Sequence, residues 1–158
     1  MPSIIILDTG PLSNAAVSFA KPGNIPTLSE ECRHWISDCE QSGSVLLVPG
    51  ICYYEALREL ERRRAASKIQ RLQEFLFGVP SRFIPLTTTH LEAAAQMWGL
   101  ARNAGISTAS NNALDADVIL CAQTLSLGLS SSDYIVATTN VGHLSRFVPC
   151  DDWKNIRP

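Results

Sequence analysis

The sequence lacks any apolar run approaching the ~20 residues of a membrane-spanning helix, so no membrane association is expected. Charge is also scarce, because only 18% of the 158 residues are charged and the formal net charge is -2. Such a chain has no general attraction to polyanions, and any contact with nucleic acid must come from a local basic patch. No internal repeat is present. The 46% of hydrophobic residues favour a globular fold over disorder, and the length fits a single domain over residues 1–158.

Cysteine is present in an odd number and without any Cys-x-x-Cys pair. No signal peptide precedes the five cysteines, so we expect reduced thiols in a cytoplasmic protein. Cys32 and Cys39 fall on one face of a predicted helix. Small core residues are favoured there over metal ligands.

Short apolar runs alternate with helical patterns along the chain, and this alternation predicts an α/β fold with a parallel sheet. Strands are expected at 3–7, 45–48, 83–86 and 134–138, with a possible fifth at 147–148. Helices are expected at 11–20, 29–40, 51–64, 67–77, 87–103 and 112–127, and a small, polar loop at 105–111. Ser29 is the expected cap of the second helix.

Three carboxylates recur in one structural context. Asp8 follows the first strand, Glu55 lies in the helix after the second, and Asp117 lies in the first turns of the helix before the fourth. Asn140 follows the fourth strand. Parallel strands end, and the helices after them begin, at the sheet edge where ligands bind. The alternative for Asp8 is that it only caps the following helix, since Asp is a favoured cap residue.

Clustered carboxylates repel one another unless a cation lies between them. Oxygen ligands with few His or Cys select Mg²⁺ or Mn²⁺, which can lower the pKa of a bound water and clamp a phosphodiester. Asp115 and Asp117 point to roughly opposite sides of their helix, so we place Asp117 in the site and Asp115 in a helix cap with Asn112. Asp133 is expected at the opposite edge of the sheet.

Four blocks of sequence then stand in a recognisable order. They are Ile-Ile-Ile-Leu-Asp8-Thr9-Gly10-Pro11-Leu12, Val-Pro-Gly-Ile-Cys-Tyr-Tyr-Glu55-Ala-Leu, Asp115-Ala-Asp117-Val-Ile-Leu-Cys-Ala-Gln-Thr-Leu and Thr138-Thr139-Asn140-Val-Gly-His143-Leu-Ser-Arg-Phe. On these blocks the chain resembles a PIN-domain ribonuclease, and most of all the VapC-type toxins of bacterial toxin–antitoxin pairs. It departs from the pattern at Asn140, where many relatives have an acid, and at Leu144, where Phe is usual.

The resemblance implies a three-layer, Rossmann-like PIN domain with a central parallel sheet of four or five strands. It implies an endoribonuclease that hydrolyses RNA with Mg²⁺ or Mn²⁺, an antitoxin partner and a homodimer. The catalytic residues would be Asp8, Glu55, Asp117 and Asn140, with the metal held by Asp8 and Asp117. Asn140 in place of an acid could weaken or remove a second metal site.

Further residues have two interpretations each. Thr9 could hydrogen-bond a ligand carboxylate, as the resemblance implies, or only stabilise a turn. Arg58 and Arg62 are candidate RNA contacts, yet Glu59 lies at pairing distance and favours a solvated face. His143 could contact substrate, although a structural hydrogen bond near a strand end is favoured, and Trp98 is expected in the core.

Two other functions compete with the nuclease. An Asp-nucleophile phosphatase requires a second Asp at the position of Gly10. A phosphoacceptor domain requires a Lys after a late strand, and the segment 138–140 lacks one. A non-catalytic, nucleic-acid-binding PIN module is the other alternative. The presence of Asp8, Glu55 and Asp117 argues against it, whereas Asn140 leaves it open.

Overall fold

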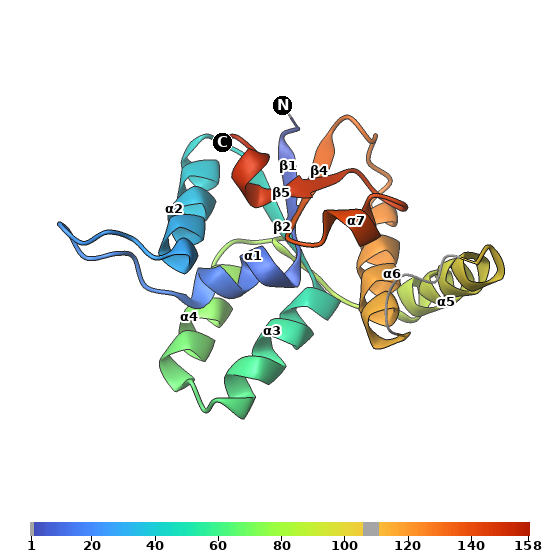
Figure 1. The fold of residues 1–158 in the computed structure, drawn as a ribbon, viewed down its shortest axis with the longest axis horizontal. Helices are drawn as coiled ribbons and strands as arrows, with labels where there is room; N and C mark the ends of the chain where they lie inside the picture. The colour runs from blue at the N-terminus through green and yellow to red at the C-terminus, as the bar shows by residue number, and fades with distance from the viewer. Residues whose placement is uncertain (1, 106–110) are drawn as a thin grey trace.

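One parallel sheet runs through the molecule, with the strand order β3-β2-β1-β4-β5. The computed structural model describes residues 2–105 and 111–158, except for the side chains of 111–113. The central strand β1 pairs with β2 on one side and with β4 on the other (Figure 1). The strands are β1 (Ile4–Leu7), β2 (Val45–Pro49), β3 (Phe83–Ile84), β4 (Tyr134–Thr138) and β5 (Cys150–Asp152).

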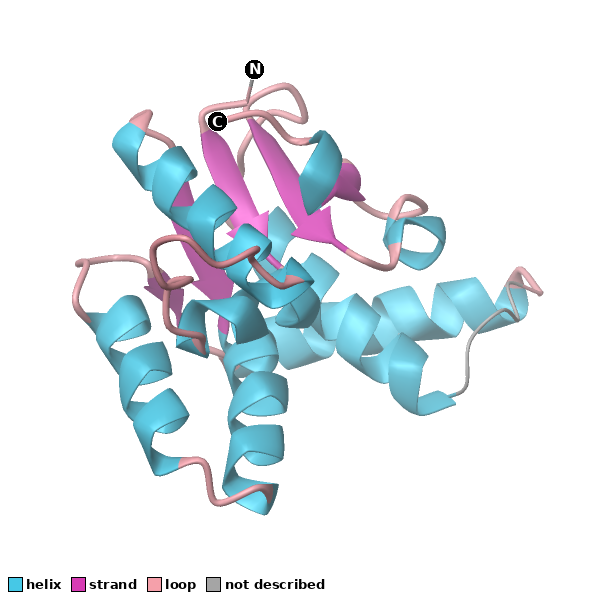
Figure 2. Cartoon of the chain, turned by 60° about the vertical axis from the view of Figure 1, so that its left-hand side comes forward, coloured by secondary structure: helices cyan, strands magenta, loops and turns pink. Residues whose placement is uncertain are grey.

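Helices flank the sheet, as Figure 2 shows around the magenta strands. Right-handed crossovers place the helices between β1, β2 and β3 on one face, and the helices that lead to β4 and β5 on the other. The three-layer, Rossmann-like PIN architecture expected from the sequence is therefore confirmed. The helices are α1 (Thr9–Ser13), η1 (Asn14–Ala16), α2 (Leu28–Gln41), α3 (Gly50–Arg62), α4 (Ala66–Phe77), α5 (Thr88–Asn103), α6 (Asn111–Leu125), α7 (Val141–Leu144) and η2 (Trp153–Asn155).

The core is centred on β1, whose side chains are buried on both faces. Ile5, Ile6 and Leu7 are at most 1% exposed, and Val48 and Val136 on the neighbouring strands are 0% exposed. A strand covered on both faces needs a continuous apolar run instead of an alternating one, which is what 4–7 provides. Each such side chain contributes about 1.5–3 kcal/mol of burial free energy.

The first predicted helix, over 11–20, is wrong in length. Helix α1 gives way to η1, which ends at Ala16, and Val17 is extended. The carbonyl of Ala16 instead accepts a hydrogen bond from Arg71 Nε at 2.7 Å. A side-chain hydrogen bond from α4 therefore satisfies a carbonyl that a longer helix would have used.

Four smaller predictions also need correction. The cap of α2 is Thr27 instead of Ser29, since Thr27 and Glu30 form a reciprocal capping box. The fifth strand is β5 and not 147–148, because Phe147 N and Val148 N donate back to Leu144 O in a turn. The third strand stops at Ile84. The predicted loop at 105–111 lies largely outside the described residues. The predicted cap at Asn112 is wrong, because α6 already begins at Asn111.

All five cysteines are free, and Cys32 and Cys39 lie in the core as expected. Among the described residues, no helix combines the length and the apolar character needed to cross a membrane.

Gln123 joins the two sides of the sheet at the start of α3. Gln123 is 0% exposed. Its Oε1 accepts from Ile51 N at 3.1 Å, and its Nε2 donates to Ile84 O at 2.9 Å. The cap residue of α3, Pro49, makes no side-chain hydrogen bond, so Gln123 on α6 supplies that helix start with an acceptor.

Replacement of Gln123 by Met should therefore destabilise the fold by about 2–4 kcal/mol, since it leaves one partly buried N–H and one buried C=O unpaired. Urea denaturation followed by circular dichroism measures this change. The matched control is Gln96→Met on the exposed side of α5, which should change the free energy of unfolding by less than about 0.5 kcal/mol. Equal effects of the two substitutions would show that Gln123 has no such bridging role.

Candidate acidic site at the carboxyl edge of the sheet

Asp8 lies directly after β1, with both carboxylate oxygens engaged. Oδ1 accepts from Thr9 N at 2.7 Å, and Oδ2 accepts from the Thr138 hydroxyl at 2.7 Å. Asp8 is therefore the N-cap of α1, as the simpler interpretation held, and it is also tied to the end of β4. These two donors fix the orientation of the carboxylate. Oδ2 keeps a further lone pair for another partner.

Thr138 is a positioning residue that the sequence analysis missed. Its side chain is completely buried, its hydroxyl donates to Asp8, and the same oxygen accepts from Asn140 N at 2.8 Å. The strand register explains this contact, because Leu7 pairs with Ala137 and so the next residues, Asp8 and Thr138, are neighbours.

Glu55 approaches Asp8 from α3 through Thr9. The Thr9 hydroxyl donates to Glu55 Oε1 at 2.8 Å, so the structure shows the carboxylate contact that was one of two interpretations for Thr9. The second oxygen, Oε2, lies 3.5 Å from Arg58 Nη2. Only 22% of the Glu55 side chain is exposed, whereas 59% of the Arg58 side chain is. Glu55 thus faces the site and Arg58 lies at its rim.

Asp117 reaches the same edge from α6, in contact with His143 of α7. Its Oδ2 lies 3.6 Å from His143 Nδ1, which is longer than a hydrogen bond, and the side chain is 13% exposed. Asn140 Nδ2 lies 3.0 Å from the same ring nitrogen. His143 therefore makes the expected hydrogen bond, and it also faces a carboxylate, which the sequence analysis did not foresee.

The pKa of Asp117 shows that the three acids act on one another. Burial, followed by the negative charge of Asp8, raises the pKa of Asp117 to about 6. His143 opposes this rise, and the charge of Glu55 adds to it. Asp117 is therefore held in an environment that disfavours its charged form when no cation is near.

A cation fits this environment, although the protein supplies only part of its coordination. Asp117 Oδ2 is buried and lacks any hydrogen-bond partner in the described structure, so it is an oxygen ligand without a partner. No group of three or more His, Cys, Asp or Glu side chains among the described residues is arranged to hold a metal ion. An ion that keeps several waters and takes one or two carboxylates, as Mg²⁺ does, suits such a donor set.

Cys52, in the first turn of α3, contacts Asp8 and was not identified from the sequence as part of the site. Its Sγ lies 3.8 Å from Asp8 Oδ1, and its side chain is fully buried. Burial raises the pKa of this thiol well above its usual value, so Cys52 remains a neutral, weak donor to Asp8.

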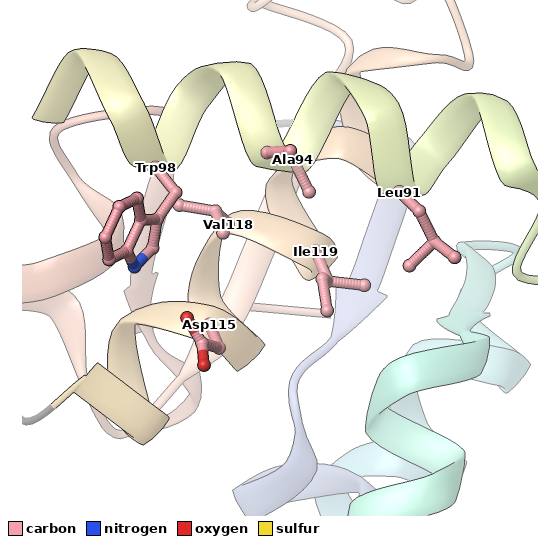
Figure 3. A pocket seen from close by; sticks show the side chains of 7 residues that line it. Leu91, Ala94, Trp98, Asp115, Val118 and Ile119 are labelled. Atoms are coloured by element: carbon pink, nitrogen blue, oxygen red, sulfur yellow. The ribbon is translucent and has the colours of Figure 1, made fainter.

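Two further acids lie away from the cluster. Asp115 lines an apolar pocket of about 480 Å³ between α5 and α6. Figure 3 shows it near Trp98, at the opposite end of the pocket from Leu91. Trp98 is partly buried, packs against the small core cluster between α5 and α6, and lines the pocket, so the core prediction for it is confirmed only in part. Asp133 lies at the start of β4, where its carbonyl accepts from Ile4 N.

The arginines of α3 divide into two groups. Arg62 donates to Glu59 at 2.7 and 2.9 Å, and Arg63 donates to the same carboxylate at 2.7 Å. These side chains form the solvated face that the interleaved charges favoured. Of the three candidate substrate contacts, Thr9 and Arg58 touch Glu55 of the acidic site, whereas Arg62 pairs with Glu59.

Comparisons with known proteins give structural matches only. No family model matches the chain, and no curated protein does. One similar solved structure is FitAcB from Neisseria gonorrhoeae, with a TM-score of 0.60, 19% identity, and coverage of 96% of this chain and 99% of the other. Another is VapBC-1 from nontypeable Haemophilus influenzae, with a TM-score of 0.54, 14% identity and the same two coverages.

These matches overturn the assignment to the VapC-type toxins. Both solved structures are complexes, and identities of 19% and 14% show a shared fold without showing which family the chain belongs to. The four sequence blocks lie where this fold brings strand ends and helix starts together. They therefore indicate the fold, and they do not show membership of one family. The predicted fold is therefore confirmed, and the assignment to the VapC-type toxins is wrong.

Replacing Asp117 by Asn should stabilise the metal-free protein. The folded state raises the pKa of Asp117 from 3.8 to about 6, so it binds more protons than the unfolded state in that window and loses stability as the pH rises through it. Above about pH 6, the substitution removes a cost on the order of 1–3 kcal/mol. Thermal unfolding in EDTA at several pH values tests this.

The gain should disappear at about pH 3, where the carboxyl is protonated in both the folded protein and, largely, the unfolded chain. Asp133→Asn, at the exposed opposite edge, is the control and should leave the melting temperature unchanged. A lower melting temperature for Asp117→Asn at about pH 8 would mean that the charged carboxylate holds the fold together.

Proposed function

We propose that this chain is an endoribonuclease that hydrolyses RNA phosphodiesters with the help of Mg²⁺ or Mn²⁺. The observation that carries the proposal is the buried oxygen of Asp117, which has no hydrogen-bond partner and lies in the field of Asp8 and Glu55. Burying a carboxylate among like charges costs stability, and a cation is the partner that removes this cost.

Asp8 and Asp117 would hold the ion, directly or through its waters. When bound, the ion would lower the pKa of a water and offset negative charge on the phosphate. Thr138 and Thr9 N hold the Asp8 carboxylate in one orientation, so it need not reorganise when substrate arrives.

Glu55 is suited to receive a proton during hydrolysis. Its Oε1 is held by the Thr9 hydroxyl, whereas Oε2 lies 3.5 Å from the exposed Arg58. Oε2 can therefore take up a proton from an attacking water. Asn140 carries no charge. Its amide contacts His143, so it can orient a water or, through the His143 ring, the carboxylate of Asp117.

The solved structures of similar fold are toxin–antitoxin complexes, and this favours a role in such a system with a protein partner that neutralises the activity. A cytoplasmic location and a homodimer belong to the same proposal. The Asp-nucleophile alternative has no support from the site, because Asp8 is held by a backbone amide, a hydroxyl and a thiol with no Lys among these contacts.

A non-catalytic nucleic-acid-binding module remains the second candidate. The specific observation in its favour is that the described residues provide no group of three metal-ligating side chains. The cleavage assay separates these two functions.

Cleavage of a mixed RNA pool in Mg²⁺ or Mn²⁺ should be abolished by EDTA. Asp8→Asn, Glu55→Gln and Asp117→Asn should each lower the rate by at least about 100-fold, because each removes a charge on which the site depends. Asp115→Asn and Asp133→Asn, which lie outside the cluster, should cleave like the parent protein.

End mapping of the products tests the chemistry. Water attack predicts ends without a cyclic phosphate, whereas 2′,3′-cyclic phosphates would mean that the RNA's own 2′-hydroxyl attacks. Cleavage that persists in EDTA would contradict the metal. RNA binding without any cleavage would favour the non-catalytic module.

A further inference from the structure

The outer side of α3 carries Tyr54, an aromatic side chain that the core does not use. The residue is 57% exposed, although Arg58, one turn further along the helix, lies over its ring at 5.4 Å from the guanidinium carbon to the ring centroid. An exposed aromatic ring leaves apolar surface in water, and a flat ligand that covers it would bind favourably.

A continuous row of contacts joins this ring to the acidic site. Arg58 Nη2 lies 3.5 Å from Glu55 Oε2. Glu55 Oε1 accepts from Thr9 Oγ1 at 2.8 Å, and Thr9 N donates to Asp8 Oδ1 at 2.7 Å. Tyr54 therefore stands at the outer end of a row whose inner end is the candidate metal ligand Asp8.

We propose that Tyr54 and Arg58 form a platform for an unpaired nucleobase next to the scissile phosphodiester, an inference that rests on the proposed function. The base stacks on the Tyr54 ring, and Arg58 pairs with an adjacent phosphate. Arg58 is available for this exchange, because its ion pair with Glu55 is long and its side chain is 59% exposed. Arg62, which forms two short hydrogen bonds with Glu59, is not.

This platform selects the unpaired state of the nucleic acid. In a duplex, neighbouring bases cover the faces of each base, so a tyrosine on a helix surface cannot stack on it. In a single strand or a loop the faces are open, and every base has one, so stacking tolerates any sequence. The expected substrate is therefore single-stranded or looped RNA, with little preference for the base at this position.

Fluorescence anisotropy tests the platform, with a 5′-labelled single-stranded RNA of mixed sequence as the probe, at low salt and in EDTA to prevent hydrolysis. The same strand annealed to its complement and the same strand with abasic positions are the comparison probes. The parent protein should bind the single strand more tightly than either. Tyr54→Leu should weaken binding of the single strand on the order of tenfold and bind all three probes alike.

Tyr54→Phe keeps the ring and should bind the single strand like the parent protein. Phe19→Leu is the matched control, since Phe19 is a 47% exposed aromatic residue that packs on His34 and Arg33 outside the site, and it should change nothing. In cleavage assays, Tyr54→Leu should raise KM far more than it lowers kcat.

The proposal is overturned if Tyr54→Leu binds the single strand as tightly as the parent protein. It is also overturned if the parent binds the duplex equally well, or if Tyr54→Phe loses as much affinity as Tyr54→Leu. Tyr54-dependent binding by a protein that cleaves no RNA would support the platform and contradict the nuclease. Cleavage with an unchanged KM in Tyr54→Leu would contradict the platform and support the nuclease.

Discussion

Parallel pairing of β1 with both β2 and β4 is the constraint on which the site depends. The register that places Leu7 beside Ala137 also places Asp8 beside Thr138, and the hydroxyl of Thr138 then holds the carboxylate of Asp8. Pairing with β2 brings the start of α3, and with it Glu55, to the same edge. A slip of one residue in the pairing of β1 with β4 would send the side chains of Asp8 and Thr138 to opposite faces of the sheet.

This arrangement gathers negative charge that the fold does not neutralise. Asp8 and Glu55 have hydrogen-bond donors, whereas the buried oxygen of Asp117 has none, and His143 lies too far for a hydrogen bond. Arg82, a buried charge on the other side of the molecule, is paired with Glu40 and with the carbonyl of Phe75, although its Nε lacks a hydrogen-bond partner in the described structure. Among the buried side-chain atoms of the described structure that lack a hydrogen-bond partner, Asp117 Oδ2 is the carboxylate oxygen, and carboxylates with a raised pKa concentrate at functional sites.

Much of the architecture followed from apolar patterning. The continuous runs of β1, β2 and β4 and the 3.6-residue period of the long helices predicted these elements to within a few residues. Elements whose limits depend on tertiary contacts were misplaced. Helix α1 ends early because Arg71 takes the carbonyl of Ala16, and β5 begins late because a turn follows α7.

The site was predictable only in part. Strand ends and helix starts gave Asp8, Glu55 and Asp117, since topology alone brings them to one edge. Thr138, Cys52 and the contact between His143 and Asp117 depend on register and side-chain packing, for which the sequence carries no periodic signal. The four sequence blocks located the fold, but they did not determine the family.

Calorimetric titration with Mn²⁺ tests the central claim, that Asp8 and Asp117 form a cation site, most directly. The account predicts binding to the parent protein and to Asp115→Asn, and loss of binding in Asp8→Asn and Asp117→Asn. The affinity of the parent should fall between about pH 7 and about pH 5, because protons compete for Asp117. Unchanged Mn²⁺ binding in Asp117→Asn, or no binding to the parent protein at all, would contradict it.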